Sequence, residues 1–234
     1  MAINYGTLKQ SEKELISKFY DYLEHTYQMH LKVLEALDSY EDLINKNKLL
    51  QEIYEMEKMS NIIHSDLLDE SVWIISKEQP QASHLRFVIA IINSINDLER
   101  ICDYANNLSK FLDRNLTIYT PALKVLKNLE NKAIINYQKV FDFFKQNDAS
   151  EAHKYVLELQ KKFWNEYSMS LKTLKNIYVN ENEVFNNNNN NTTEYFIELI
   201  LAIKNIERIM DHVMNVVNHF VFIKESNFFF RKKD

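Results

Sequence analysis

The stretch "LERICDYANNL" spans Leu98 to Leu108, and "IERIMDHVMNV" spans Ile206 to Val216. Both read apolar–Glu–Arg–Ile–x–Asp–x–x–x–Asn–apolar. The same offset aligns residues 95–107 with 203–215, and apolar positions beyond the motif follow it too. One constant offset indicates a duplicated structural unit. The identical pairs are Ile95/Ile203, Glu99/Glu207, Arg100/Arg208, Ile101/Ile209, Asp103/Asp211 and Asn107/Asn215.

The composition favours helices. The 234 residues include one Gly and two Pro, which is too few chain breakers for a turn-rich β architecture. Apolar residues recur every three to four positions almost throughout, which is the helical pattern. We therefore predict six long helices, at Thr7–Asp38, Tyr40–Lys77, Ser83–Asp113, Thr120–Gln146, Ala149–Val179 and Thr193–Lys224.

The two motif copies fall on the third and sixth of these helices, so each repeat holds three helices. Helices of this length suit bundles in which short loops join antiparallel neighbours. We predict an all-α fold of two tandem, pseudo-symmetric three-helix bundles, residues 1–117 and 118–234. Pro80 should interrupt the chain before Ser83, a good N-cap, and the run Asn186–Asn191 should be a solvated loop.

Charge and hydropathy exclude several classes of function. The 28 basic and 33 acidic residues are well mixed and give a net charge of −5, so we expect no nucleic-acid partner. No apolar run approaches the ~20 residues of a membrane span, and the N-terminal sequence does not resemble a signal peptide. We expect a cytoplasmic protein. The C-terminal "NFFFRKKD" should fold back on the bundle, with contact to a membrane surface or a transporter subunit as the alternative.

The repeated motif places acidic side chains in a stripe along one helix. Glu99, Asp103 and Asn107 are spaced by four, so they lie one turn apart beside the apolar face, with Asp97 and Arg100 farther from it. Half-buried carboxylates this close repel each other and need a positive partner. Oxygen ligands of this kind suit Mg²⁺, Ca²⁺, Mn²⁺ or iron. The alternative is a network of salt bridges with the motif arginines or with lysines of adjacent helices.

The stretches "ERICDYANN" and "IERIMDHVMN", with "ISKEQPQASHLRFVIAI" before the first, resemble the PhoU family of phosphate-uptake regulators. The resemblance covers essentially the whole chain. In that family, two three-helix bundles each carry a metal-binding motif of this form, with further acids from the middle helix. The resemblance implies a first site at Glu99, Asp103 and Asn107, joined by Glu57, and a second at Glu207, Asp211 and Asn215.

The chain departs from the family pattern near both motifs. The usual Gly after Glu-Arg-Ile is Cys102 in the first copy, where we expect it to pack in the core, and a methionine in the second. The second middle-helix acid falls on His64. In the second half the corresponding positions look like Gln160 and Trp164. We therefore expect the second site to be poor in metal and the first to be the better candidate.

The remaining histidines and tryptophans are expected to be structural. His30, His84 and His219 have no partner at a fixed spacing, which is typical of surface or satisfied core histidines. Trp73 and Trp164 should fill space between helices. His212 directly follows an acid, which does not match the Glu-x-x-His pattern of di-iron bundles.

The resemblance also implies a function. Family members bind divalent or multinuclear metal, so we expect iron, with zinc, manganese or magnesium as alternatives. The implied partner is the ATPase subunit of a phosphate ABC transporter, and a sensor kinase where the cell has one. Such a protein restrains phosphate uptake. We further expect a homodimer that reaches the membrane only through its partners.

We expect no enzymatic activity, because the chain has no Gly-rich phosphate loop and no nucleophile beside a base. Two alternatives remain open. One is a metalloenzyme with a carboxylate-bridged metal pair. The other is a metal-free helical docking protein whose acidic stripes are paired by arginine and lysine.

Overall fold

The computed structural model describes residues 5–146, 149–180 and 192–221, and within these ranges the chain is helical without any strand. The prediction of an all-α fold is confirmed. The Asn186–Asn191 run, the predicted helix end at Lys224 and the Phe-rich C-terminal stretch lie outside the described residues. The helices are α1 (Tyr5–Asp38), α2 (Leu43–Glu78), α3 (Ser83–Arg114), α4 (Thr120–Gln146), α5 (Ala149–Asn180) and α7 (Thr192–Val221).

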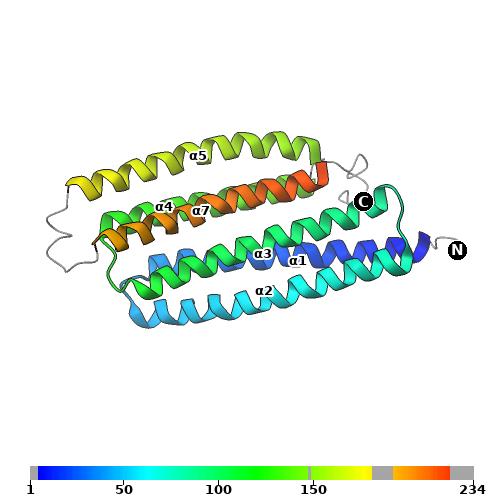
Figure 1. Cartoon of the computed structure of the whole chain (residues 1–234), viewed down its shortest axis with the longest axis horizontal. Coiled ribbons are helices and arrows are strands. Elements are labelled where there is room, and N and C mark those ends of the chain that lie inside the picture. The colour runs from blue at the N-terminus through cyan, green and yellow to red at the C-terminus, as the bar shows by residue number, and fades with distance from the viewer. Residues whose placement is uncertain (1–4, 147–148, 181–191, 222–234) are drawn as a thin grey trace.

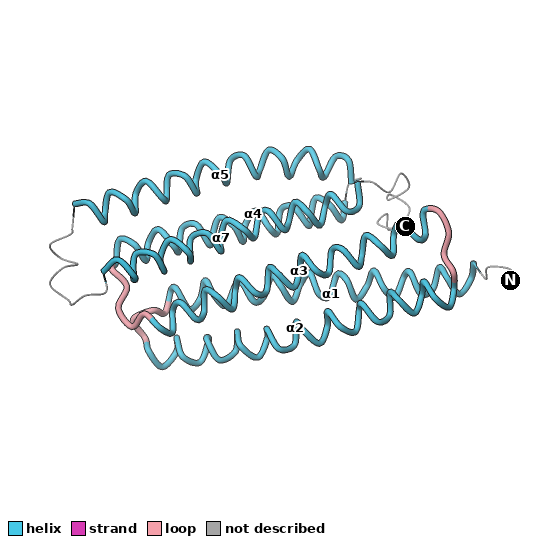
Figure 2. Tube along the Cα trace, in the orientation of Figure 1, coloured by secondary structure: helices cyan, strands magenta, loops and turns pink. Residues whose placement is uncertain are grey.

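The helices form two bundles that lie side by side along the long axis of the molecule (Figures 1 and 2). Helices α1, α2 and α3 pack together, and α4 and α5 pack together with α7. The bundles meet where α3 packs on α7 and α1 packs on α4, a contact that we call the seam. The expected division at residues 117 and 118 falls in the connection between α3 and α4.

The start of α2 and the cap of α3 differ from the predictions, whereas α3 begins at Ser83 as predicted. Helix α2 begins at Leu43 rather than Tyr40, because the Asp42 side chain accepts a hydrogen bond from the backbone N–H of Asn45 (3.1 Å) and caps the helix there. Ser83 is not an N-cap, which is a correction. The cap position is Ala82, which has a φ of 52° and makes no side-chain capping bond.

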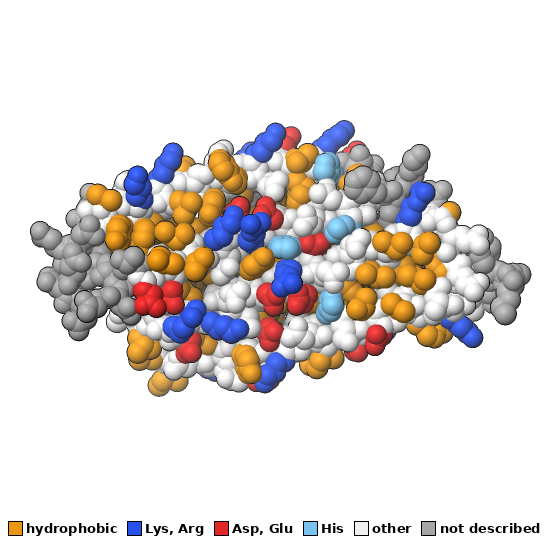
Figure 3. Space-filling model, viewed as in Figure 1, with side chains coloured by type: hydrophobic (Ala, Val, Ile, Leu, Met, Phe, Trp, Pro, Cys, Tyr) orange, Lys and Arg blue, Asp and Glu red, His pale blue; other side chains and the backbone are white. Residues whose placement is uncertain are grey.

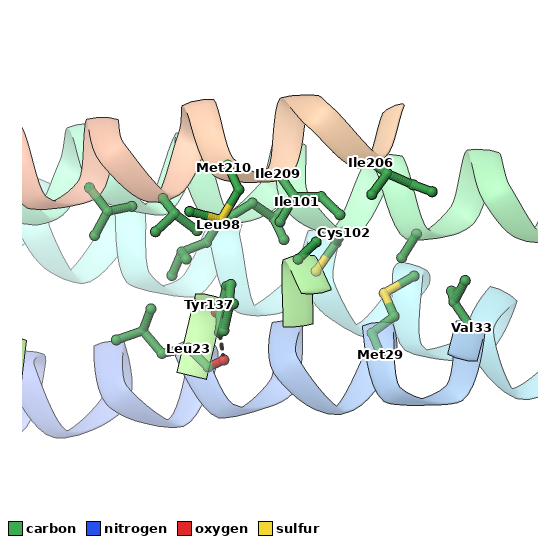
Figure 4. Close-up of a cluster of buried hydrophobic side chains, with 14 of the residues drawn as sticks. Leu23, Met29, Val33, Leu98, Ile101, Cys102, Tyr137, Ile206, Ile209 and Met210 are labelled. Atoms are coloured by element: carbon green, nitrogen blue, oxygen red, sulfur yellow. Dashed lines mark hydrogen bonds between the residues drawn. The ribbon is translucent and has the colours of Figure 1, made fainter. Parts of the chain in front are cut away.

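One apolar core runs through both bundles. Figure 4 shows Leu23 and Met29 of α1 near Leu98 and Ile101 of α3, with Ile206 and Met210 of α7 beyond them. Such continuity makes the seam part of the core. The residues labelled there are Leu23, Met29, Val33, Leu98, Ile101, Cys102, Tyr137, Ile206, Ile209 and Met210.

Cys102 is 1% exposed within this core, and burial raises the pKa of its thiol to about 12. It therefore packs as an apolar residue, as predicted. The two tryptophans, in contrast, do not pack in the core. Trp73 is 51% exposed and Trp164 is 57% exposed, so the prediction that they fill space between helices is wrong.

A buried polar contact joins α1 to α4 across the seam. The Nδ1 atom of His30 lies 2.7 Å from Oε1 of Glu130, and its Nε2 lies 2.9 Å from the carbonyl oxygen of Ile101. Both side chains are almost fully buried, with exposures of 3% and 0%. His30 is thus a satisfied core histidine, as predicted.

Candidate functional site

The first stripe, formed by Glu99, Asp103 and Asn107, lies on α3 at the margin of the first bundle. The Glu99 and Asp103 side chains are 27% and 30% exposed, and Asn107 is exposed. Arg100 reaches both acids, with its Nη1 donating to Oδ2 of Asp103 (3.0 Å) and its Nε 3.7 Å from Oε2 of Glu99. The half-buried position predicted from the helical spacing is therefore observed.

Helix α2 brings Glu57 and His64 to the first stripe. Burial raises the pKa of Glu99, and the neighbouring charges of Asp103 and Glu57 raise it further. His64 acts on Glu99 in the opposite direction, and its Nε2 lies 2.8 Å from Oδ1 of Asn96. The first site therefore consists of three carboxylates from two helices with one guanidinium among them.

The second stripe, formed by Glu207, Asp211 and Asn215, lies on α7. Arg208 repeats the role of Arg100, because its Nη1 donates to Oδ2 of Asp211 (3.0 Å). Lys204 adds a second positive charge, and its ammonium pairs with Oε2 of Glu207. Glu207 is the more buried of the repeated glutamates, with a side chain 9% exposed.

Helix α5 contributes no carboxylate at the position that Glu57 occupies in the first site. Gln160 stands there instead, and its amide Nε2 donates to Oδ1 of Asp211 (3.3 Å). Trp164 does not occupy the position equivalent to His64, because it follows Gln160 by four residues whereas His64 follows Glu57 by seven. Tyr167 follows Gln160 by seven residues, as His64 follows Glu57, and Lys204 lies over its ring at 5.4 Å from the centroid.

The two stripes approach each other across the seam. The repeat partners Tyr104 and His212 meet there, with ring centroids 5.5 Å apart and the tyrosine hydroxyl 3.3 Å from Nε2 of His212. Burial raises the pKa of the Tyr104 hydroxyl. The positive charges of Arg208 and Arg100 lower this pKa, and the negative charges of Asp103 and Asp211 raise it. Figure 3 shows acidic, basic and histidine side chains gathered near the middle of this face.

A buried carboxylate at the seam was missed from the sequence. Asp97 was expected farther from the apolar face, yet its side chain is only 10% exposed. It accepts hydrogen bonds on Oδ1 from His212 Nδ1 (2.6 Å) and Asn215 Nδ2 (3.0 Å), and it pairs through Oδ2 with His219 Nε2 (2.7 Å). His219 therefore has a specific partner, and Asn215 points to Asp97 at the seam.

Hydrogen bonding dominates the ionisation of Asp97. Burial acts to raise its pKa, but the bonds from His212, His219 and Asn215 outweigh burial and hold the pKa at about 2. The signal that could have revealed this cluster is the spacing of the three donors. Positions 212, 215 and 219 are three and four residues apart, so they lie on one face of α7.

The donor chemistry of the two sites differs with respect to a metal ion. The first site offers carboxylate oxygens from two helices, which suits a hard cation. The second site offers two carboxylates already paired with Lys204 and Arg208, and an amide in place of the third acid, which does not suit one. Across the described ranges, no three His, Cys, Asp or Glu side chains converge closely enough to hold a metal ion.

Comparisons with known proteins agree on one family. The PhoU domain model matches residues 22–112 and, separately, residues 122–219. The Mycoplasma genitalium protein MG409, itself uncharacterized, is 37% identical over 97% of this chain and 98% of its own length. The phosphate-specific transport system accessory protein PhoU of Escherichia coli K12 is 28% identical over 77% of this chain and 72% of its own length.

Solved structures agree on the fold. The crystal structure of PhoU from Pseudomonas aeruginosa superposes with a TM-score of 0.79 at 20% identity, covering 93% of this chain and 98% of that one. The phosphate transport system regulatory protein PhoU from Streptococcus pneumoniae gives a TM-score of 0.75 over 93% of this chain and 96% of that one. The chain belongs to the PhoU family. None of its described helices is long and apolar enough to cross a membrane.

Proposed function

We propose that this chain is a regulatory accessory protein of phosphate transport that docks on the ATPase subunit of a phosphate ABC transporter. The observation that carries this proposal is the match of the PhoU domain to both halves of the chain. The E. coli relative named as an accessory protein of phosphate-specific transport supports it. On this proposal the protein is cytoplasmic, acts without catalysing a reaction, restrains phosphate uptake and reaches the membrane through its partner.

The first site is the proposed cation site. Glu57, Glu99 and Asp103 would hold a divalent cation, with iron, manganese, zinc or magnesium as candidates. Its support is the excess of negative charge around a half-buried glutamate, which a cation would neutralise. Because these three side chains do not converge closely enough as they stand, a cation would have to draw Glu57 of α2 toward Glu99 and Asp103 of α3.

A second candidate function is that of a metal-free helical docking protein. The salt bridges of Arg100, Arg208 and Lys204 favour it, because they already neutralise part of both stripes. On this alternative the stripes are structural or docking surfaces and the transporter partner stays the same.

The test is co-purification of the full-length chain with the ATPase subunit from the same cell, at high and low phosphate, with and without chelator. We expect complex formation that responds to phosphate supply. Absence of the ATPase under all four conditions would contradict the accessory role. Complex formation unaffected by chelator, in a protein that takes up no metal, would favour the metal-free alternative. Light scattering on the purified chain alone tests the homodimer that the family resemblance leads us to expect.

A further inference from the structure

The repeat allows the two sites to be compared position by position. The offset that pairs Glu99 with Glu207 pairs Asn96 with Lys204. In the first site, Asn96 is neutral and its amide oxygen lies 2.8 Å from Nε2 of His64. In the second site, Lys204 is charged and pairs directly with Glu207. One substitution thus places a fixed positive charge in one site and leaves it out of the other.

The charge balance follows from this difference. Arg100 pairs with Glu99 and Asp103, and the charge of Glu57 acts on Glu99 as well, so the first site carries an excess of negative charge. In the second site the two carboxylates face two cations, Lys204 and Arg208, and the neighbour from α5 is the neutral Gln160. The second site is neutral without any added ion.

The position of the lysine is itself supported by packing. Lys204 lies on the same helix as Glu207, three residues before it, and its ammonium lies 5.4 Å from the centroid of the Tyr167 ring on α5. The aromatic face favours a cation there. Tyr167 stands where the first site has His64, so both differences between the sites favour a resident ammonium in the second.

We infer that the Lys204 ammonium is a built-in cation of the second site, so that this chain takes up a divalent metal at the first site alone. The inference rests on the metal binding proposed above. It gives the two pseudo-equivalent sites different properties. The first responds to the supply of a divalent cation, whereas the second is permanently compensated and independent of metal.

The test measures binding of Mn²⁺ alone to the full-length chain, by calorimetry and by the loss of the free-ion resonance signal. We expect Glu99→Gln to weaken binding at least tenfold and Asp211→Asn to leave it unchanged. Asn96→Lys, which copies the resident ammonium into the first site, should abolish binding. Lys204→Asn should add a second class of sites, and the charge-preserving control Lys204→Arg should not. Binding that survives Glu99→Gln but is lost in Asp211→Asn would overturn the inference.

A second measurement separates this inference from the metal proposal. If the wild-type chain binds no Mn²⁺, the proposed metal function fails, and urea unfolding of metal-free protein decides about the lysine. A built-in cation predicts that Glu207→Gln lowers the unfolding midpoint, because Lys204 then faces no charge, whereas Glu99→Gln leaves the midpoint unchanged or raises it. Equal shifts in the two variants would overturn the inference.

Discussion

Replacing Asp97 with asparagine tests how much the seam depends on one buried carboxylate. The substitution keeps the size of the side chain and removes the charge that His212, His219 and Asn215 bind. The pKa of Asp97 is lowered from 3.8 to about 2. At ~1.4 kcal/mol per pKa unit, the folded state gains about 2–3 kcal/mol from the ionised form. The side chain is 10% exposed, so solvent screening takes little of this away.

We expect Asp97→Asn to lower the free energy of unfolding at pH 7 by about 2–3 kcal/mol. The folded pKa lies below the unfolded value, so the contribution is complete above about pH 5. It is lost as pH falls from about 4 towards 2. The difference between wild type and variant should therefore shrink over that interval.

The assay is urea unfolding of the full chain followed by circular dichroism and by tryptophan fluorescence. The chain has two tryptophans, Trp73 on α2 and Trp164 on α5, so single-tryptophan variants report on each bundle separately. Asp113→Asn is the matched control, because Asp113 is an exposed acid on the same helix. A loss no larger than that of the control, about 0.5 kcal/mol or less, would refute the reasoning.

Three further outcomes are expected. His30→Ala should lower the free energy of unfolding by about 3 kcal/mol, because it leaves Glu130 buried without its donor. Replacing both His30 and Glu130 with leucine should recover part of this loss. Denaturant unfolding curves measure both effects. The raised pKa of Glu99 makes its ionised form costly, so metal-free wild type should gain stability as pH falls from 7 towards 5, and Glu99→Gln should reduce that gain in a thermal melt. Chelation of metal-loaded protein should lower the melting temperature of wild type and not of Asn96→Lys, and identical melting shifts in the two proteins would contradict a cation at the first site.

The repeat and the apolar spacing were sufficient to predict the helices, because each helix must bury one face along its whole length. The helix start at Tyr40 and the N-cap at Ser83 were misplaced for a local reason. Spacing of apolar residues does not show which polar residue caps a helix, and Asp42 took that role for α2. The stripe of Glu99 and Asp103 was predictable because its position depends on a single helix.

The Asp97 cluster could not be derived in the same way, because it depends on two helices. Within the first bundle alone, Asp97 lies away from the apolar face. The second bundle covers that side of α3, and α7 supplies the three donors. The salt bridge of Lys204 was similarly hidden, since the motif alignment drew attention to identical residues and Asn96/Lys204 is a difference.

Some of the differences between the two repeats lie where the copies meet. The offset maps Asp97 onto Asn205, and the donors His212 and His219 onto Tyr104 and Phe111. One of the two equivalent positions at the seam therefore holds a carboxylate with two histidines, and the other holds neither. Apolar contacts alone would tolerate a slip of one turn between α3 and α7. A buried carboxylate tolerates no such slip, because it would lose its donors without regaining water. The Asp97 cluster therefore fixes the register of α3 against α7, as the buried His30–Glu130 contact does for α1 against α4, and it depends on residues in which the two halves differ.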